Sequence, residues 1–411
     1  MIMNLRSDAD GIIQESLAAI LPDAAVEKAL RGHTFGTGRI VLVAVGKAAW
    51  QMARAASDEL GSRIDRGIVI TKYGHIKGDI PNISCREAGH PVPDANSFAA
   101  TQEALDLTAD LAAEDTVLFL LSGGGSALFE KPLIPPAELT DLTEQLLASG
   151  ADIVAVNTLR KRMSAVKGGR FAEHCAPAQV FTIVLSDILG DPLDMIASGP
   201  AYPDTSTAKD AYAVMKKYSI RLSPAATKLL DAALPTELPN VTTHITGSVR
   251  ELCAAAAEAA QRRGYTPVLL TDQLDCEARE AGRFLAAIAR THAHAGSFAY
   301  IAGGETVVQL KGRGRGGRNQ EIALAAADGI AGIPNVAVFS VGSDGTDGPT
   351  DAAGGYVDGG TAAALARERR SAAEALAEND AYPALNDVGG LIVTGPTGTN
   401  VNDVSVLLIR G

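Results

Sequence analysis

Several apolar segments of the sequence are followed by polar, glycine-rich stretches that could bind a charged ligand. Lys47 follows the apolar run at 40–45, where a lysine can neutralise a phosphate as a point charge. The stretch LLSGGGSALF at 120–129 offers consecutive backbone amides and two hydroxyls to an anion. Taken alone, it is equally typical of a tight turn without a ligand. The candidates in this loop are Ser122, Gly123, Gly124, Gly125 and Ser126.

Two further loops are rich in aspartate. Asp187 and Asp191 follow the apolar run at 179–185, where two carboxylates could hold Mg²⁺ or one could accept a proton from a hydroxyl. Turn formation and helix capping are equally common uses of such residues. Asp344 and Asp347 lie in a loop whose spacing does not fit an EF-hand. These two residues indicate a metal or a hydroxylated ligand, with a run of turns as the alternative.

The segment KGRGRGGRNQE contains the pattern GxGxxG, but it does not read as a dinucleotide-binding fingerprint. Three arginines lie among its glycines, and the residues before it predict an antiparallel hairpin instead of the first strand of a βαβ unit. An arginine loop leading into a helix at Arg318 suits a nucleoside triphosphate or a carboxylate. The alternative is a solvated hairpin tip. Asn400 adds an amide to a last loop, TGPTGTNVND.

Unbroken apolar strands alternating with helices must position these loops. They predict an α/β fold with a Rossmann-like parallel sheet covered on both faces, and ligands bind such sheets beyond the carboxyl ends of the strands. A second α/β pattern follows the proline-punctuated stretch 222–247, and its sheet is expected to be mixed. A P-loop is absent, because Val41 and Ala48 break the motif around Gly46 and Lys47.

Composition narrows the class of protein. A chain of 411 residues with 46% hydrophobic and 20% charged residues predicts a soluble protein of two domains. The net charge of −12 argues against broad binding to nucleic acid or to anionic membranes. Four scattered cysteines show no metal or redox spacing, and no signal peptide or membrane span is apparent, so a cytoplasmic protein is expected.

The chain also resembles the class II glycerate 2-kinases, the family whose C-terminal part is called the MOFRL domain. The matching segments cover nearly the whole chain in order, and together they are highly specific. They are VAVGKAA, EAGHPVPD, LLSGGGSALFEKP, NTLRKRMSAVKGGR, VLSDILGDPLDMIASGP, GGETVVQLKGRGRGGRNQE, SVGSDGTDGPTDAAGG and TGPTGTNVND. The pair Arg162-Met163 departs from the family pattern, so no role is assigned to position 162.

The resemblance implies phosphorylation of D-glycerate to 2-phosphoglycerate by ATP with Mg²⁺. It implies a Rossmann-like glycerate kinase domain over 1–240, a smaller MOFRL domain over 241–411, and an active site in the cleft between them. Some relatives carry the name hydroxypyruvate reductase. The family's active-site positions correspond to Lys47, Asp187, Arg318, Asp344 and Asn400.

A mechanistic hypothesis follows for a small-molecule kinase. Lys47 and Arg318 would neutralise the γ-phosphate or the glycerate carboxylate, and the amides of 122–126 would cradle one of these anions. Asp187 would accept or position the 2-hydroxyl proton. Asp344, with Asp191 or Asp347, would bind Mg²⁺, and Asn400 would fix a substrate hydroxyl.

Two alternatives stay open at this stage: an NAD(P)H-dependent hydroxypyruvate reductase and a non-catalytic protein that binds a sugar acid or a nucleotide. The sequence leaves the oligomeric state undecided, with a homodimer as a candidate.

Overall fold

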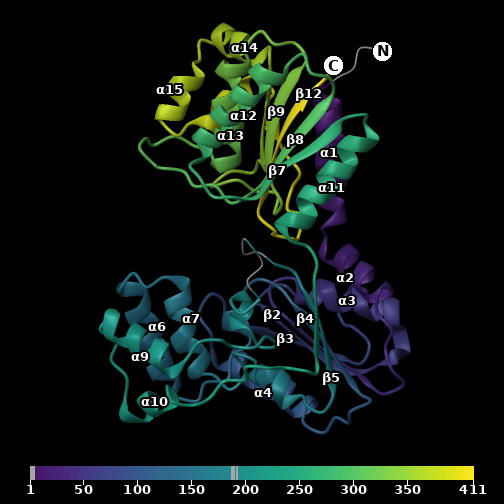
Figure 1. Ribbon diagram of the computed structural model, residues 1–411, viewed down its shortest axis with the longest axis vertical. Coiled ribbons are helices and arrows are strands. Elements are labelled where there is room, and N and C mark those ends of the chain that lie inside the picture. The colour runs from purple at the N-terminus through teal and green to yellow at the C-terminus, as the bar shows by residue number, and fades with distance from the viewer. Residues whose placement is uncertain (1–4, 187–189, 191–192) are drawn as a thin grey trace. The chain divides into compact units, whose positions relative to one another are not determined.

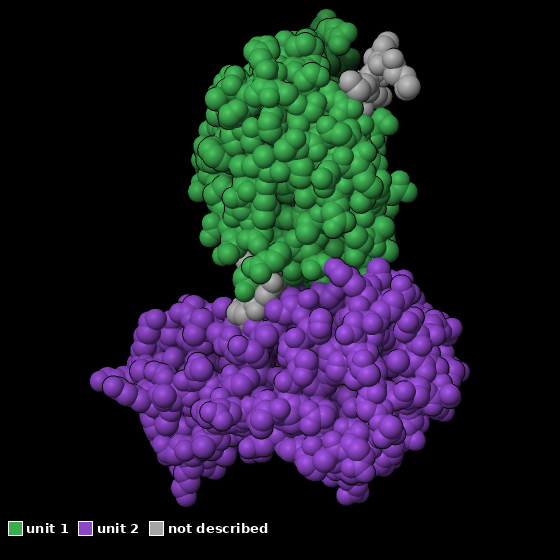
Figure 2. Space-filling view, turned by 45° about the vertical axis from the view of Figure 1, so that its right-hand side comes forward, with its two compact units in different colours: residues 1–21, 187–190, 247–411 green, residues 22–186, 191–246 purple. Residues whose placement is uncertain are grey.

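The computed structural model describes residues 5–186, 190 and 193–411. These residues form two compact units, drawn in different colours in Figure 2. We call residues 22–186 and 193–246 the parallel-sheet unit. Residues 5–21, 190 and 247–411 form the mixed-sheet unit.

A six-stranded sheet organises the parallel-sheet unit. Its order is β3-β2-β1-β4-β5-β6, and every neighbouring pair is parallel, which is the order of the dinucleotide-binding Rossmann fold. The predicted Rossmann-like sheet is therefore confirmed. The strands are β1 (Ile40–Val45), β2 (Ile64–Lys72), β3 (Ile83–Ala88), β4 (Thr116–Leu121), β5 (Gln179–Val184) and β6 (Val241–Ile245).

Helices on both faces explain why β1 and β4 read as unbroken apolar runs. Leu118 and Leu120 pack in the cluster that contains the apolar sides of the second and third helices. Phe119 points to the opposite face, where its ring centroid lies 5.9 Å from that of Phe129 and 4.9 Å from that of Phe171. The helices of these layers are α2 (Pro22–Arg31), α3 (Ala49–Leu60), η1 (Gly61–Arg63), α4 (Ala95–Leu107), α5 (Gly125–Leu128) and α8 (Arg170–His174).

Four more helices of this unit form a group with its own apolar core (Figure 1). They are α6 (Pro136–Ala148), α7 (Ile153–Arg162), α9 (Ala208–Lys217) and α10 (Pro224–Leu229). Arg162, the departure from the family pattern, is buried among them and donates to the backbone carbonyls of Leu230, Ala232 and Ser206. Position 162 therefore has a structural role in joining α7 to the loops around α9 and α10.

The second unit has the expected mixed sheet, in the order β11-β10-β9-β12-β8-β7. Strands β7 and β8 are parallel, and the other neighbours are antiparallel. The strands are β7 (Thr266–Leu274), β8 (Phe298–Gly304), β9 (Val336–Gly342), β10 (Gly354–Asp358), β11 (Leu391–Ile392) and β12 (Asp403–Ile409).

The first and eleventh helices pack in one core cluster of this unit, and the twelfth and thirteenth pack in another. The helices are α1 (Leu5–Ala19), α11 (Val249–Arg262), α12 (Ala278–His292), α13 (Arg318–Ala327), η3 (Asp328–Ile330), α14 (Thr361–Arg367), α15 (Ala372–Ala377) and α16 (Ala381–Asp387). In the part of the chain that the structure describes, no helix has the length and apolar character needed to span a bilayer.

Two regular elements lie on the other side of the expected division at 240/241. Strand β6 lies beyond residue 240, but it pairs with β5 and completes the parallel sheet. Helix α1 lies before residue 240, but its apolar face packs on α11, and Glu15 pairs with Arg262 and Arg263 at 2.6 Å each. The first helix therefore belongs to the mixed-sheet unit.

The predicted hairpin before Arg318 is wrong. After β8 the chain runs as an extended loop whose backbone is bound by the segment between α15 and α16. The amides of Lys311 and Gly312 donate to the Asn379 side chain at 2.8 and 3.0 Å, and Gly314 donates to the Glu378 carbonyl at 2.8 Å. These acceptors bind the backbone amides of the loop, so no returning strand is needed to pair with them.

Candidate functional site

The switch point of the parallel sheet brings two predicted loops together. Strands β1 and β4 are neighbours, and chain connections leave them in opposite directions along the sheet. Ligands bind α/β sheets at such a point, beyond the carboxyl ends of the strands. Lys47 follows β1, and the loop 122–126 follows β4, so the sequence-predicted anion site falls where the fold is best suited to hold it.

Direct hydrogen bonds join these two loops. The Lys47 amide donates to the Gly123 carbonyl at 2.9 Å, and the Ala48 amide donates to Ser122 Oγ at 3.1 Å. Gly46 has φ of +121°, and a Cβ there would lie 2.2 Å from Ser122 Oγ, so only glycine permits this approach. The Lys47 side chain is exposed, so its ammonium is available to a ligand.

His90 was not among the predicted site residues, yet it lies beside the glycine-rich loop. A Cβ on Gly124, where φ is +89°, would be 3.1 Å from the His90 ring and 3.2 Å from Lys47 Cγ. Burial lowers the pKa of His90, and the charges of Lys47 and Lys72 lower it further. A neutral imidazole therefore lies next to the exposed lysine. The matching segment EAGHPVPD was the only sequence signal for it.

A buried chain of polar groups supports the other end of this loop. Ser126 Oγ lies 3.1 Å from Ser198 Oγ, and Ser198 donates to Asn157 Oδ1 at 2.8 Å. The buried ammonium of Lys167 donates to the carbonyls of Ser126 and Phe129 at 3.0 and 2.8 Å. The loop is therefore held through its backbone and through one of its hydroxyls.

The segment that carries Ser198 has an unusual backbone. Ala197 and Ser198 have φ of 51° and 63°, in the left-handed region that non-glycine residues avoid. Each such residue costs of order 1–3 kcal/mol, and such strain is concentrated at functional sites. The carbonyls of Ser198 and Gly199 accept from Gly168 and Gly169 at 3.0 and 2.7 Å. These bonds hold the strained segment in place.

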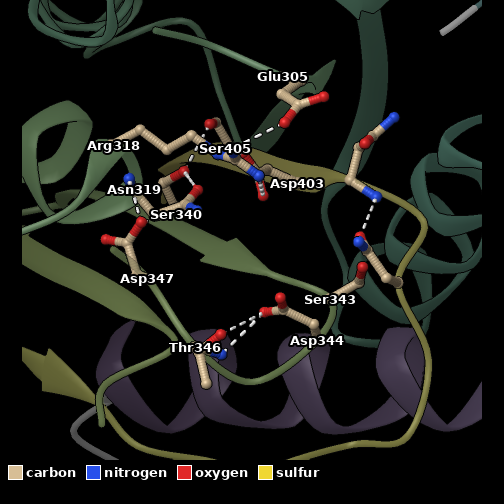
Figure 3. A network of polar contacts seen from close by, with 12 residues as sticks. Glu305, Arg318, Asn319, Ser340, Ser343, Asp344, Thr346, Asp347, Asp403 and Ser405 are labelled. Atoms are coloured by element: carbon tan, nitrogen blue, oxygen red, sulfur yellow. Dashed lines mark hydrogen bonds and ion pairs between the residues drawn. The ribbon is translucent and has the colours of Figure 1, made fainter. Parts of the chain in front are cut away.

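The second group of predicted residues lies at one end of the mixed sheet. Strands β8 and β9 end where β12 begins, and Asp403 is paired with Gly304 on one side and Gly342 on the other. Arg318, the first residue of α13, reaches this point from above the sheet (Figure 3). Its guanidinium binds Asp403 through Nε at 2.6 Å and Nη2 at 3.1 Å, while Nη1 binds Glu305 at 2.9 Å.

These ion pairs fix the charge state of Arg318. Burial acts against its positive charge, but the hydrogen bonds and charge of Asp403 outweigh burial and raise the pKa of Arg318. The Asp403 side chain is only 5% exposed, whereas that of Glu305 is 47% exposed. Asp403 therefore orients the guanidinium, and Nη1 is the donor that an incoming anion can reach by displacing Glu305. Neither carboxylate was predicted, although both lie in segments that resemble the family.

Asp347 occupies a different environment from the expected metal ligand. Its buried carboxylate accepts from the amides of Asn319 and Gln320 at 3.1 and 2.9 Å, at the start of α13. Burial raises the pKa of Asp347 to about 7, while these two donors act in the opposite direction. The geometry is that of a helix cap contributed by a distant loop, which holds the helix that carries Arg318.

Asp344 and Asn400 lie in two loops that are hydrogen-bonded to each other. Asp344 Oδ1 accepts from the amide and hydroxyl of Thr346 at 2.9 and 3.1 Å, and Thr397 donates to the Asp344 carbonyl at 3.2 Å. Asn400 is exposed, and its Oδ1 accepts from the Asn402 amide at 3.3 Å. Both side chains keep polar atoms available for a ligand.

The fit of Mg²⁺ rests mainly on Asp344. Within the described residues, both hydrogen bonds to its side chain end on Oδ1, which leaves Oδ2 for a cation. Mg²⁺ commonly binds through one or two carboxylates, with substrate phosphates and water as the other ligands. No group of three acidic, histidine or cysteine side chains suited to a metal occurs in the described ranges. Asp187 and Asp191, the predicted base and metal ligand, lie outside the described residues.

Comparisons with known proteins agree over the whole chain. Residues 8–231 match a domain of unknown function, DUF4147, and residues 298–403 match the MOFRL family. The D-glycerate 2-kinase of Thermotoga maritima is 50% identical over 99% of each chain. The glycerate 2-kinase of Pyrococcus horikoshii is 38% identical over 99% of this chain and 98% of its own.

The solved structures lead to the same family. A crystal structure of glycerate kinase from Thermotoga maritima has a TM-score of 0.95 at 50% identity and covers 98% of this chain and 99% of its own. Both sheets, the switch-point loops and the Arg318 site therefore lie in a framework shared along nearly the full length. The chain belongs to the glycerate 2-kinase family, whose C-terminal part is the MOFRL domain.

Proposed function

We propose that this chain transfers the γ-phosphoryl group of ATP to the 2-hydroxyl of D-glycerate and releases 2-phosphoglycerate and ADP. The observation that carries the proposal is the 50% identity to a D-glycerate 2-kinase over the full length of both chains. The placement of Lys47 and the glycine-rich loop at the switch point supports it. So does an arginine with one donor that an anion can reach.

Phosphoryl transfer depends on positioning and on neutralising charge more than on covalent help from the protein. We assign Lys47 and Arg318 to the anionic groups of the two substrates, the γ-phosphate of ATP and the glycerate carboxylate. Asp403 orients Arg318 for this task. The amides of 123–125, in the loop fixed by Lys47, would contact one of these anions.

The reaction also requires a proton acceptor. The 2-hydroxyl oxygen forms a bond to the γ-phosphorus while the bridging oxygen–phosphorus bond to ADP breaks, and the hydroxyl proton passes to Asp187. Asp344 would hold Mg²⁺ with Asp191, and Asn400 would contact a substrate hydroxyl. Mg²⁺, when bound, supplies charge neutralisation at the phosphates. We assign Asp347 to the capping of α13, on which Arg318 depends.

A direct assay tests the proposal. Purified protein is incubated with D-glycerate, ATP and Mg²⁺, ADP release is followed with a coupled enzyme, and the product is identified by phosphorus NMR. The expected product carries phosphate on the 2-hydroxyl. A product phosphorylated on the 3-hydroxyl would contradict the position, and absence of glycerate-dependent ADP release would contradict the activity.

The same assay separates the two alternatives. A hydroxypyruvate reductase would consume NADH with hydroxypyruvate, and a binding protein would turn over neither substrate. The strand order is that of dinucleotide-binding folds, but the turn from β1 to α3 holds a single glycine, Gly46, in place of the fingerprint. We therefore expect no NADH consumption.

We also infer a cytoplasmic enzyme, and a homodimer stays the candidate for its oligomeric state. The four cysteines, Cys85, Cys175, Cys253 and Cys276, are free thiols, which suits a reducing compartment. Subcellular fractionation tests the location. Light scattering after size exclusion tests the homodimer, and a mass of one chain would contradict it.

A further inference from the structure

The chain of hydroxyls behind the glycine-rich loop has a defined direction, and this direction determines what Ser126 can bind. The starting point is Asn157, which is buried in α7. Its amide nitrogen lies 3.2 Å from the Met195 sulfur. A thioether sulfur accepts hydrogen bonds and cannot donate one, so the NH₂ group must face Met195 and Oδ1 must face Ser198.

The orientation of Asn157 determines which serine hydroxyl donates and which accepts. Oδ1 of Asn157 can only accept, so Ser198 uses its single proton in the 2.8 Å bond to that atom. Ser198 Oγ can therefore only accept at the 3.1 Å contact with Ser126 Oγ. Ser126 must donate its proton inward. On its partly accessible side, Ser126 Oγ then offers only lone pairs, which can accept a hydrogen bond but cannot donate one.

From this direction we propose that Ser126 accepts a hydrogen bond from an aliphatic hydroxyl of a substrate and does not donate to a phosphate or a carboxylate. Ser198 and Asn157 are the positioning residues that impose this polarity. The inference rests on the proposed function, since glycerate and the ribose of ATP both offer such hydroxyls. It changes the expected role of Ser126 from anion binding to hydroxyl recognition, and it leaves the amides of 123–125 available to anions.

Packing around this relay, which consists of Ser126, Ser198 and Asn157, keeps the Ser126 hydroxyl in this orientation. A Cβ on Gly125 would lie 2.6 Å from the Ala197 Cβ, so the strained segment sits directly against the loop. Lys167 holds the Ser126 carbonyl at 3.0 Å from the other side. Ser198 itself is fully buried. Rotation of the Ser126 hydroxyl toward an outside acceptor would abandon a bond inside this packed region.

Binding measured by calorimetry without turnover provides the test. D-Glycerate, D-lactate, which lacks the 3-hydroxyl, and 3-hydroxypropionate, which lacks the 2-hydroxyl, are titrated into wild type and Ser126→Ala. We expect the variant to bind D-glycerate about 10-fold more weakly. Relative to wild type, Ser126→Ala should bind the analogue that keeps the recognised hydroxyl about 10-fold more weakly. It should bind the analogue that lacks this hydroxyl with unchanged affinity. Ser149→Ala, whose hydroxyl donates to the Leu146 carbonyl at 2.8 Å, is the matched control.

A nucleotide arm distinguishes the source of the hydroxyl. If glycerate affinity is unchanged, ATP is compared with its 2′-deoxy and 3′-deoxy forms. Recognition of ribose is supported if Ser126→Ala binds ATP more weakly than wild type does but binds one of the deoxy forms with the wild-type affinity. Equal losses for glycerate and both analogues would show an anion contact and overturn the inference, as would unchanged affinity in both arms.

The positioning role of Ser198 needs a readout that a structural role would not change. Ser198→Gly removes the hydroxyl but suits the left-handed backbone, so the melting temperature should change little. We expect it to weaken binding as Ser126→Ala does, and the double variant should lose no more than either single variant. Additive losses would overturn the relay. Ser126-dependent glycerate binding in a protein that does not phosphorylate glycerate would end the kinase proposal and leave this inference standing.

Discussion

The substitution Gly317→Ala gives the sharpest test of how the Arg318 site is built. Gly317 immediately precedes α13, and a Cβ there would lie 2.3 Å from both Cγ and Oδ1 of Asp347 and 2.5 Å from its backbone carbon. The residue has φ of −143° and ψ of 179°, an extended conformation that alanine adopts freely. Steric overlap is therefore the cause of the expected defect, and the Asp347 loop must move away.

The size of the effect follows from the bonds that this movement breaks. Asp347 would lose the amides of Asn319 and Gln320. Above about pH 8, where Asp347 is ionised, hydrogen bonds to its charged carboxylate contribute about 1.5–3 kcal/mol each, so we expect a loss of about 3 kcal/mol or more there. For a domain of this size, that lowers the melting temperature by roughly 6–12 °C. Displacement of Arg318, the next residue, should also lower kcat/KM by more than about 10-fold.

Calorimetry and steady-state kinetics with D-glycerate and ATP provide the measurements. Gly360→Ala is the matched control, because Gly360 also precedes a helix of the mixed-sheet unit and has a negative φ of −93°. Its nearest neighbour would be a side-chain oxygen of Asp358 at 3.3 Å, which can shift. Equal melting temperatures and equal kcat/KM in the two variants would refute the capping role of Asp347.

Three further predictions follow from the same contacts. Lys47→Ala should lower kcat by orders of magnitude and leave the melting temperature within about 1 °C, because the side chain is exposed; a fully active variant would remove Lys47 from the mechanism. Arg318→Lys should lower kcat/KM at least about 100-fold, since one ammonium cannot reproduce the bidentate pair with Asp403, and wild-type kinetics would contradict that pairing. The Arg39 guanidinium lowers the pKa of Asp115 to about 2, so its stabilisation is complete above about pH 4 and lost as the pH falls toward 2. Asp115→Asn should therefore cost about 1–2 kcal/mol at pH 7 and progressively less as the pH falls through 2, measured by thermal unfolding across that range; a cost independent of pH would contradict the ion pair.

The sequence was sufficient for the central strands of both sheets. Strands β1 and β4 are apolar without interruption because both of their faces are covered. Strand β6 was not predicted, since it is an edge strand of mixed polarity within the proline-punctuated stretch 222–247. Its place depends on pairing with β5, which no local pattern encodes.

The site shows the same division between local and long-range information. Loops after strands led to the predictions for Lys47, Arg318 and the glycine-rich turn, because glycine and charge in such loops are local signals. The partner of Arg318 is Asp403, which is 85 positions away, and only the antiparallel pairing of β12 with β8 and β9 brings it there. Asp347 was expected at a metal for the same reason, since its carboxylate meets α13 only in the folded chain.

The position of α1 has a consequence for how the protein is made. This helix leaves the ribosome before the parallel-sheet unit, but α11, on which its apolar face packs, is synthesised about 230 residues later. At roughly 5–20 residues per second, α1 waits about 10–50 s with Ile12, Ile13 and Leu17 uncovered. The nascent chain therefore exposes the apolar face of α1 while the parallel-sheet unit is synthesised. This makes α1 the segment that a chaperone would bind.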